Sequence, residues 1–207
     1  MKVAIVNYGM CNLASVRRAL EDIGAEPYIT DSPAALYDAD KVVLPGVGAF
    51  AEGMRQLNDA GWVDALHDVV VERRKPMLGI CLGMQMLASV GEEGGGAAGL
   101  GFVPGRVQRL DTLGCKLRIP HVGWNEIRYK TNDELFNGIP DASDFYFVHS
   151  YAFVPDNDEH LIATVSYGCD VTAVIRNGNV FGCQFHPEKS SKAGRLLLKN
   201  FVNCLPC

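Results

Sequence analysis

Cys81 lies between two glycines in a segment whose pattern could carry nucleophilic chemistry. The apolar stretch 77–80 predicts a buried strand, and 82–89, which has few β-branched residues, is typical of a helix. Gly79 and Gly83 leave room for a sharp strand-to-helix turn that presents the cysteine at the edge of a sheet. The unpaired N–H groups at the start of that helix would favour the reactive thiolate. The pattern alone fits a buried structural cysteine equally well.

A second motif, His186-Pro187-Glu188, supplies the partners that a nucleophilic thiol needs. The base that activates the thiol must itself be held in one tautomer by a third group. Pro187 biases His186 toward extended backbone, where residues two apart point to the same side, so its imidazole can meet the carboxylate of Glu188. This motif alone is typical of a surface loop. Together with Cys81 it predicts a catalytic triad.

The composition limits the class of protein. A chain of 207 residues that is 48% apolar buries roughly 70% of its unfolded surface, so we expect one domain, 1–207, that needs no disulfide or metal for stability. Its net charge of −5, with no basic cluster, argues against nucleic acid or an anionic membrane as a partner. The chain opens with a strand instead of a signal peptide, and no apolar run approaches the ~18 residues of a membrane helix. We expect a cytoplasmic protein with no metal site and no cofactor.

The number and spacing of the cysteines also suit a cytoplasmic protein. There are seven, an odd number without framework spacing, which is typical of reduced thiols in a cytosol. Cys204 and Cys207 have C-x-x-C spacing, but no second pair or nearby histidine offers metal ligands. We interpret them as part of a frayed C-terminal tail in preference to a redox pair.

The N-terminal half alternates strands and helices. Expected strands cover 2–6, 27–30 and 41–44, and expected helices cover 13–23, 51–58 and 63–74. Asn12 is placed to cap the first helix and Gly24 to end it. Such alternation indicates an open α/β sheet, in which ligands bind outside the carboxyl ends of the strands. Cys81 and the turn 45–48 both fall there.

After residue 102 the pattern changes to short alternating runs separated by turn signals, which predict strands. These runs cover 103–110, 125–129, 145–148, 161–165, 171–175 and 180–183. Asn177-Gly178 predicts a hairpin that leads into the His186 segment, and 190–203 predicts a closing helix. The glycine-rich segment 91–101 predicts a flexible loop, and it lacks the Gly-Lys-Ser/Thr of a phosphate loop. The expected fold class is α/β, an open, mostly parallel sheet flanked by helices with an antiparallel extension.

Several motifs resemble those of a known enzyme family. G-I-C-L-G-M-Q around Cys81 and Q-F-H-P-E-K-S around His186 are similar to the class I, triad-type glutamine amidotransferases, whose Cys, His and Glu release ammonia from glutamine. Four further motifs narrow the resemblance to the glutaminase subunits of imidazole glycerol phosphate synthases, in histidine biosynthesis. They are N-Y-G-M-C-N-L (7–13), P-G-V-G-A-F (45–50), P-H-V-G-W-N (120–125) and Y-F-V-H-S-Y (146–151), and they extend over nearly the whole chain.

The resemblance implies roles for individual residues. Cys81 would be the nucleophile, His186 the base and acid, and Glu188 the group that orients His186. The oxyanion would be held by the N–H of Leu82 and by an N–H from the turn 45–48, which would otherwise be an ordinary strand-to-helix loop. Val47 and Gly48 are the alternative donors in that turn. Residues implied to contact glutamine are Gly46, Gln85, Glu93, Ser150 and Tyr151.

Two of these assignments have close competitors. Glu93 matches the acidic residue of the family by its spacing from Cys81, but Glu92 is adjacent. His149 could be mistaken for the catalytic base, although no carboxylate lies two residues away from it. His186 is therefore preferred as the base.

The chain has no evident site for an ammonia acceptor, because it contains no nucleotide phosphate loop and no G-x-G-x-x-G motif. An acceptor enzyme would therefore be a separate chain. The resemblance implies a heterodimer with a (βα)8-barrel cyclase subunit. That subunit would use ammonia and a phosphoribulosyl aminoimidazole-carboxamide nucleotide to make imidazole glycerol phosphate and AICAR. Residues expected at the interface are Asn12, Trp124, Tyr146 and Lys189.

Two features bear on that interface. Trp124 falls in a predicted surface loop, 120–125, where an indole is a favoured interface anchor, whereas the alternative is a ring folded back onto the core. Cys11 stands where the family motif usually has glycine, so a positive φ at this position would strain the loop.

Three other functions compete with this interpretation. The glutaminase of another synthase, such as anthranilate synthase, is disfavoured by the valine of P-G-V-G and by P-H-V-G-W-N. A stand-alone cysteine hydrolase would turn over glutamine without a partner. A non-catalytic interaction module would be expected to have lost part of the triad, whereas all three residue types are present.

Overall fold

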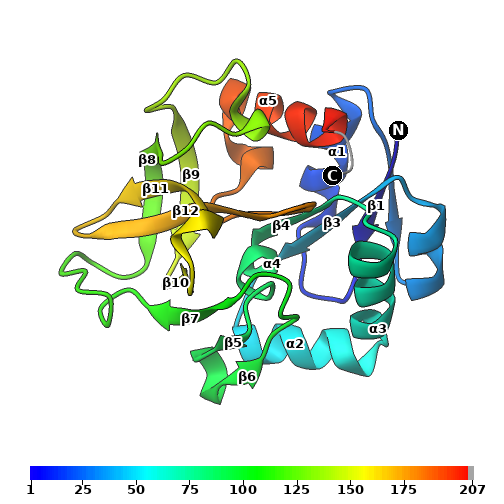
Figure 1. The fold of residues 1–207 in the computed structure, drawn as a ribbon, viewed down its shortest axis with the longest axis horizontal. Coiled ribbons are helices and arrows are strands. Elements are labelled where there is room, and N and C mark those ends of the chain that lie inside the picture. Colours follow the sequence, from blue (N-terminus) through cyan, green and yellow to red (C-terminus); the bar gives the residue numbers. More distant parts are fainter. Residues whose placement is uncertain (205–207) are drawn as a thin grey trace.

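The computed structural model describes residues 1–204, and its main feature is a nine-stranded sheet (Figure 1). The strands lie in the order β2 (Glu26–Thr30), β1 (Lys2–Val6), β3 (Lys41–Gly46), β4 (Met77–Cys81), β13 (Val180–Cys183), β12 (Asp170–Asn177), β11 (Leu161–Ser166), β8 (His121–Tyr129) and β9 (Asp144–His149). The first five run parallel to one another, and each later strand is antiparallel to the one before it. The predicted fold class, a parallel sheet with an antiparallel extension, is confirmed.

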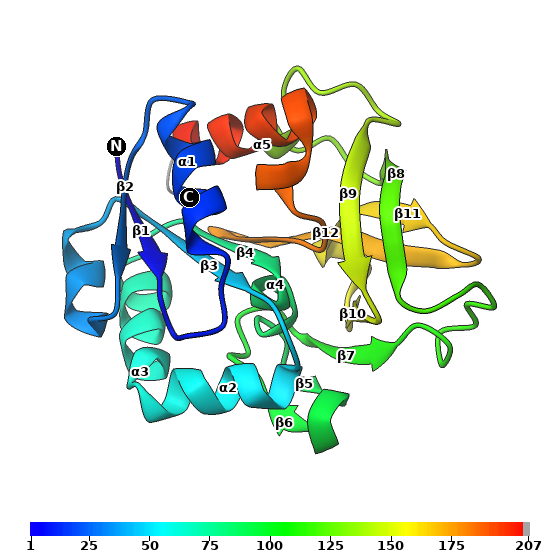
Figure 2. The same ribbon diagram turned by 180° about the vertical axis from the view of Figure 1, so that it is seen from behind.

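Alternate residues of the parallel strands face two apolar cores. In β1, Val3 and Ile5 join one core while Ala4 and Val6 join the other, and all four are fully buried. Helices α1 (Leu13–Glu21) and α5 (Ser191–Asn203) cover the first core, and α2 (Phe50–Asp59) and α3 (Trp62–His67) cover the second (Figures 1 and 2). A sheet covered on both faces has strands that are apolar throughout. Because helices cover both faces of the sheet, a ligand site can form at the carboxyl ends of the strands.

The helices begin near the predicted positions but differ in detail. α1 begins after Asn12, which occupies the predicted N-cap position, but its side chain makes no capping hydrogen bond. The helix predicted over 63–74 is α3 followed by a wider π-helical turn, Asp68–Glu72. The helix predicted over 82–89 is α4, which covers only Leu82–Gln85. None of the helices within 1–204 has the length and apolar character required to cross a bilayer.

α4 is short because a later segment of the chain takes the hydrogen bonds that would extend it. The N–H of Leu100 donates to the carbonyl of Met86 at 2.8 Å, and the N–H of Gly101 donates to that of Ala88 at 3.0 Å. These carbonyls would otherwise bond within the helix. Gly99 allows the close approach, because a Cβ atom there would overlap the carbonyl oxygen of Ala88.

In the antiparallel half, the predicted hairpin is confirmed and a predicted loop is wrong. β12 and β13 form the expected hairpin, with Asn177 opposite Val180 and a left-handed φ of 57° at Gly178. The segment 120–125 was predicted as a loop, but residues 121–125 form the first part of β8. It pairs with β9, which lies far along the sequence, so the local pattern could not show the strand.

A second sheet has four strands in the order β10 (Tyr151–Pro155), β7 (Gly105–Arg109), β5 (Val90–Gly91) and β6 (Ala97–Ala98). β10 was not predicted, and only Ser150 separates it from β9. The glycine-rich segment, predicted as a flexible loop, holds β5, β6 and a 3-10 turn at Glu93–Gly95. The junction of β9 and β10 therefore lies next to the segment that carries Glu93, and both line one pocket.

Candidate active site

Cys81 occupies a strained turn between β4 and α4. Its φ of 55° and ψ of −110° are unusual for a residue with a side chain. A Cβ atom at Gly79 would lie 2.7 Å from the carbonyl oxygen of Gly83, and one at Gly83 would overlap the carbonyl oxygen of Leu44 in β3. Both neighbours must therefore be small, as their spacing predicted. The turn holds the thiol beside the end of β3, where Gly46 pairs with Cys81.

His186 and Glu188 follow the end of β13, the strand that neighbours β4. The Nδ1 of His186 donates to Oε1 of Glu188 at 2.8 Å, and both side chains are almost fully buried. The backbone of His186 is also held, since its N–H donates to the carbonyl of Tyr146 at 2.9 Å and its carbonyl accepts from the Ser190 hydroxyl at 2.6 Å. These bonds fix the position and tautomer of the imidazole.

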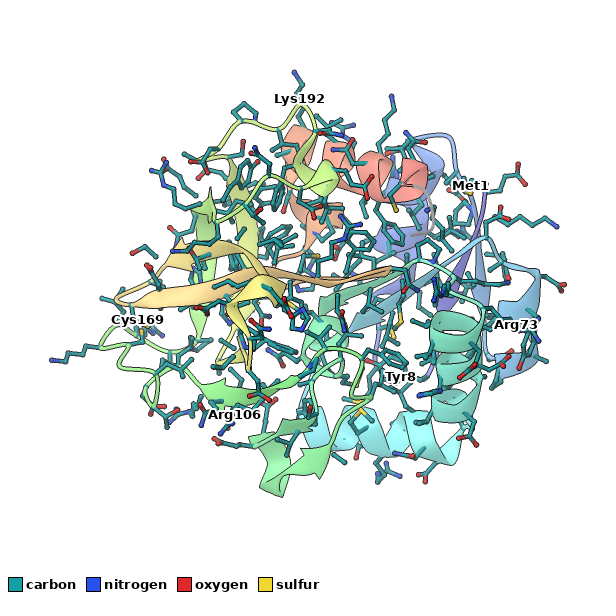
Figure 3. The ribbon with its side chains drawn as sticks, viewed as in Figure 1. Met1, Tyr8, Arg73, Arg106, Cys169 and Lys192 are labelled. Carbon is teal, nitrogen blue, oxygen red and sulfur yellow. The ribbon has the colours of Figure 1, made fainter. Side chains whose placement is uncertain are left out.

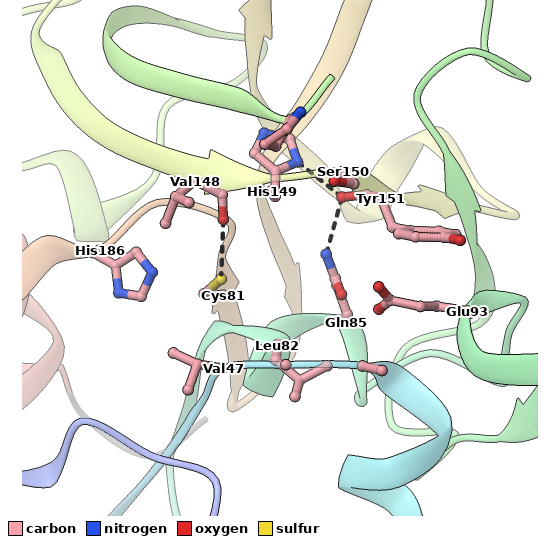
Figure 4. A pocket seen from close by; sticks show the side chains of 13 residues that line it. Val47, Cys81, Leu82, Gln85, Glu93, Val148, His149, Ser150, Tyr151 and His186 are labelled. Atoms are coloured by element: carbon pink, nitrogen blue, oxygen red, sulfur yellow. Dashed lines mark hydrogen bonds between the residues drawn. The ribbon is translucent and has the colours of Figure 1, made fainter. Parts of the chain in front are cut away.

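This environment changes the titration of His186. Burial alone would lower its pKa, but Cys81 and Glu188 outweigh burial and raise the pKa of His186 to about 9. Its Nε2 is buried and forms no hydrogen bond with any atom of residues 1–204. Figure 4 shows the His186 ring facing the Cys81 side chain. Nε2 is therefore the nitrogen that could exchange a proton with Cys81.

We expect the His186 imidazole to remain protonated above neutral pH and to titrate near pH 9. Glu188→Gln removes the carboxylate and should move the pKa back toward the ordinary value of 6.5. Because the pKa is raised on folding, His186 stabilises the fold fully below about pH 6.5, and this contribution is lost as the pH rises through about 9. Imidazole nitrogen NMR measures the pKa, and Cys81→Ala separates the part due to the thiol. An ordinary pKa in all three proteins would contradict the expected coupling.

Cys81 and His186 line a pocket of about 520 Å³ (Figure 4). The Cys81 Sγ lies 3.9 Å from the carbonyl oxygen of Val148 and 3.8 Å from Nε2 of Gln184. The Gln184 side chain also accepts a 3.0 Å bond from Nε2 of Gln85. Gln184 is fully buried, and its sequence motif alone predicted no role for it. The available signal was its place in the Q-F-H-P-E motif, two residues before His186.

Four of the five residues predicted to contact substrate line this pocket. They are Gln85, Glu93, Ser150 and Tyr151. Gly46 is buried and is not among the lining residues. Figure 4 shows Gln85 and Glu93 across the pocket from His186. The Nε2 of Gln85 donates to the carbonyl of Tyr151 at 3.0 Å as well as to Gln184, so its side-chain oxygen is the atom left for a ligand.

The structure distinguishes Glu93 from its neighbour Glu92. Oε2 of Glu93 accepts a 3.1 Å bond from the N–H of Phe50, the first residue of α2, and burial raises the pKa of this carboxyl. Glu92 is exposed and bonds to Gln108. Only Glu93 of the two lines the pocket.

His149 also lines the pocket, but both its ring nitrogens have partners. Because a carbonyl can only accept, Nδ1–H of His149 donates to the carbonyl of Tyr151 at 2.8 Å. Its Nε2 then accepts from Nδ1–H of His121 at 2.9 Å, and Nε2 of His121 accepts from the Asn125 amide at 2.8 Å. Burial lowers the pKa of His149 to about 3 and that of His121 to about 4, so both rings are neutral at pH 7. This environment leaves His149 without a nitrogen free to act as a base.

The turn 45–48 is held by the N-terminal loop. The N–H of Val47 donates to the carbonyl of Met10 at 2.9 Å. Gly48 adopts a φ of 108°, and a Cβ atom there would lie 2.6 Å from the Met10 methyl group. Leu82 is the first residue of α4, so its N–H has no acceptor within the helix. Of the two alternative donors in the turn, Val47 is thus already engaged, although it lines the pocket.

Three of the four residues predicted to face a partner lie side by side, namely Trp124, Tyr146 and Lys189. Trp124 is 50% exposed, and its ring lies edge-on to that of Tyr146, with 6.0 Å between the ring centres. The Nζ of Lys189 lies 5.8 Å from the centre of the Tyr146 ring. Asn12 is exposed, and Ser15, one turn further along α1, lines the same surface groove as Lys189. The indole of Trp124 is therefore on a strand, not in a loop, and it is not folded back onto the core.

Two cysteines singled out from the sequence lie in ordinary, well-held backbone. Cys11 does not adopt a positive φ, so the expected strain at this position does not arise. Cys204 is buried, and the Nζ of Lys41 donates to its carbonyl at 2.6 Å and to its sulfur at 3.3 Å. It is held in place rather than frayed. Cys207 lies outside the described residues.

Comparison with known proteins assigns the chain to a family. The family model for class-I glutamine amidotransferases matches residues 4–204. The chain is 49% identical to the imidazole glycerol phosphate synthase subunit HisH of Moorella thermoacetica, over 96% of this chain and 93% of that protein. It is 47% identical to the HisH subunit of Methanosarcina acetivorans, over 97% of this chain and 98% of that protein.

Solved structures share the fold at low sequence identity. A glutamine amidotransferase has a TM-score of 0.74 at 18% identity, with 96% of this chain and 98% of that chain covered. The PurLQS structure from Thermotoga maritima has a TM-score of 0.73 at 22% identity, with 98% of this chain and 97% of that chain covered. The chain belongs to the class-I glutamine amidotransferases, and within them to the family of the HisH subunits of imidazole glycerol phosphate synthase.

Proposed function

We propose that this chain is the glutaminase subunit of an imidazole glycerol phosphate synthase. It hydrolyses glutamine to glutamate and ammonia, and the ammonia passes to a cyclase subunit in histidine biosynthesis. The observation that carries the proposal is the pocket in which the strained Cys81 meets a buried His186–Glu188 pair. The nearly full-length similarity to HisH subunits supports the choice of synthase over anthranilate synthase.

In the proposed reaction, the Cys81 sulfur attacks the carboxamide carbon of the glutamine side chain. His186 gives its Nε2 proton to the nitrogen, the C–N bond breaks and ammonia leaves. Water then attacks the thioester, His186 accepts a proton from it, and the sulfur departs to give glutamate. Glu188 holds His186 in the required tautomer and stabilises its charged form. Acid and base catalysis of this kind contributes about 10² to 10⁴ fold.

Glutamine fits the chemistry of the pocket walls. The Glu93 carboxylate can accept from the substrate ammonium group, and the side-chain oxygen of Gln85 can accept from an N–H of the substrate. Gln184 donates toward the Cys81 sulfur and anchors Gln85, so it positions both the nucleophile and a substrate contact. Ser150 and Tyr151 complete the wall at the junction of β9 and β10.

The oxyanion needs two donors, and one of them is not yet in place. Leu82 can supply its N–H, but the N–H of Val47 is bonded to Met10. Rotation of the Gly46–Val47 peptide would release this N–H toward the pocket. Loss of a single oxyanion donor costs about 3 kcal/mol in the transition state. The conformation with Val47 bonded to Met10 is therefore the less active one, and the rotated peptide is the active one.

The ammonia acceptor is proposed to be a (βα)8-barrel cyclase subunit, bound as a heterodimer in the cytoplasm to this single domain of residues 1–207. The surface that supports this is apolar and next to the pocket. Val122 and Trp124 of β8 are 55% and 50% exposed, and they pair directly with Val148 and Tyr146 of β9. Val148 also lines the pocket. A partner that covered the surface formed by Val122, Trp124, Tyr146 and Val148 would close over the pocket and could receive ammonia directly.

Trp124→Ala is expected to weaken binding of the cyclase subunit by about 1 to 3 kcal/mol, the range of an aromatic anchor at an interface. Titration calorimetry of the two purified subunits measures the change. Tyr37→Ala is the matched control, because Tyr37 is also an exposed aromatic at 42% but lies beside Lys75, at the opposite end of β4. Equal affinities of the wild type and Trp124→Ala would remove Trp124 from the interface.

The function is tested by purifying the chain together with the cyclase subunit of the same organism. Glutamate release and imidazole glycerol phosphate formation are then measured with glutamine or with ammonium salt as the nitrogen source. The proposal predicts that glutamine supports synthesis only when both chains are present. Steady glutamine turnover by the chain alone would favour a stand-alone hydrolase. Synthesis from ammonium salt but not from glutamine would favour a non-catalytic module.

A further inference from the structure

The hydroxyl group of Tyr8 is buried without a hydrogen-bond partner among residues 1–204. Tyr8 is only 4% exposed, and its oxygen is fully enclosed. Figure 3 shows Tyr8 inside the molecule, and its side chain belongs to the core that α2 and α3 cover. Buried polar groups are nearly always hydrogen-bonded, because leaving one unpaired costs free energy. The hydroxyl lies near the thiol of Cys11, which is a weak hydrogen-bond partner, so a carbonyl oxygen that turned toward it would be a better acceptor.

The Tyr8 hydroxyl lies against the turn 45–48, which was predicted to supply an N–H donor to the oxyanion. A Cβ atom at Gly46 would overlap the Tyr8 oxygen, so the oxygen lies directly against the Gly46 backbone. The pKa of Tyr8 is raised, mainly by burial and to a smaller extent by nearby Cys11. The hydroxyl therefore stays protonated and can donate. Any substitution at Gly46 would displace it.

Each residue of the turn 45–48 is in contact with a residue of the segment 8–11. The carbonyl of Met10 accepts from the N–H of Val47 at 2.9 Å, and the thiol of Cys11 donates to the carbonyl of Pro45 at 3.4 Å. Gly48 lies against the Met10 methyl group. The Tyr8 hydroxyl, which lies near the Cys11 thiol, contacts Gly46 of the turn without a hydrogen bond to it.

Rotation of the Gly46–Val47 peptide creates a need for a donor at this place. The two ends of a peptide point in opposite directions, so turning the N–H of Val47 toward the pocket turns the carbonyl of Gly46 away from it. That carbonyl then faces the N-terminal loop, where the carbonyl of Met10 cannot donate to it. A carbonyl buried without a donor would disfavour the rotated state. The Tyr8 hydroxyl is next to Gly46 and has its donor free.

We propose that Tyr8 is a positioning residue that stabilises the rotated turn by donating a hydrogen bond to the carbonyl of Gly46. The proposal rests on the proposed glutaminase function, because the rotated turn supplies the Val47 N–H to the oxyanion. Tyr8 contacts neither substrate nor the thiol in this role. It acts by raising the population of the state in which the oxyanion site has two donors.

Tyr8→Phe tests the proposal because it removes only the hydroxyl. In the complex with the cyclase subunit, kcat for glutamine hydrolysis should fall about tenfold, the rate equivalent of one neutral hydrogen bond. KM for glutamine and the ammonia-dependent reaction should be unchanged. The melting temperature should be unchanged or higher, because the hydroxyl has no partner in the resting state. A merely structural role would lower the melting temperature and leave kcat per folded protein as it was.

Tyr28→Phe is the matched control. The hydroxyl of Tyr28 donates to the carbonyl of Ala35 at 2.6 Å, so its removal should lower the melting temperature and leave kcat unchanged. The proposal is overturned if Tyr8→Phe keeps the wild-type kcat, or if its kcat falls only in proportion to lost folded protein. A wild-type complex that shows no glutamine hydrolysis would instead overturn the proposed function itself. The two failures are thus separated by the activity of the wild type.

Discussion

Cys81→Ala is expected to abolish glutamine-dependent synthesis, with a loss of about 10⁴ fold or more in kcat for glutamine hydrolysis. Alanine lacks the sulfur that must bond to the carboxamide carbon, and no other thiol of residues 1–204 lines the pocket. Synthesis from ammonium salt should survive, because free ammonia bypasses the thioester and the acceptor site lies on the cyclase subunit. Glutamate release and product formation, measured in the same complex with each nitrogen source, check both parts.

Cys183→Ala is the control for the loss of a thiol near this site. Cys183 is fully buried in β13, pairs with Ile80 next to Cys81, and does not line the pocket. Its substitution should cost about 1 kcal/mol of stability and leave glutamine hydrolysis per folded protein close to that of the wild type. Loss of both glutamine-dependent and ammonia-dependent synthesis in Cys81→Ala would refute a role restricted to glutamine hydrolysis.

The sequence was sufficient to predict what depends on neighbouring residues. The glycines around Cys81 are required by contacts within the turn and with β3. His186 pairs with Glu188 as their spacing of two residues predicted, but only His186 is extended, and Glu188 lies in a 3-10 turn, Pro187–Lys189. The alternation of strands and helices likewise predicted β1 to β4, whereas β13 was predicted only as a strand of the later hairpin and its parallel pairing with β4 was not. In each case the sequence signal that predicted the feature lies within one short segment, even where the contact that requires it, such as Gly83 against Leu44, does not.

Features that depend on segments far apart in sequence were not predicted. The helix after Cys81 is cut short by hydrogen bonds from Leu100 and Gly101, and 121–126 becomes a strand by pairing with 144–149. The N–H of Val47 is engaged by Met10, which no local pattern could reveal. Gln184 has a local signal, but its role depends on Cys81 and Gln85, about a hundred residues away along the chain.

Gly83→Ala is expected to destabilise the protein by about 3 kcal/mol or more, the largest effect on folding that we predict for a change of one methyl group. The added carbon would overlap the carbonyl oxygen of Leu44, which belongs to the backbone of the central strand β3. Neither β3 nor the turn at Cys81 can move easily, because β3 and β4 are paired along their length. Urea unfolding followed by circular dichroism measures the free energy of unfolding.

Gly53→Ala separates this backbone collision from the general effect of replacing glycine. A Cβ atom at Gly53 would lie 2.8 Å from Sδ of Met86, the far end of a flexible side chain that can shift. Gly53 is also inside α2, where alanine favours the helix, so we expect a change within about 1 kcal/mol. Equal stability of the Gly83→Ala and Gly53→Ala proteins would show that β3 yields to the added carbon. Any Gly83→Ala protein that still folds should lose glutamine hydrolysis. Separating β3 from α4 would move Val47 away from Leu82, so their two N–H groups could no longer bind one oxyanion.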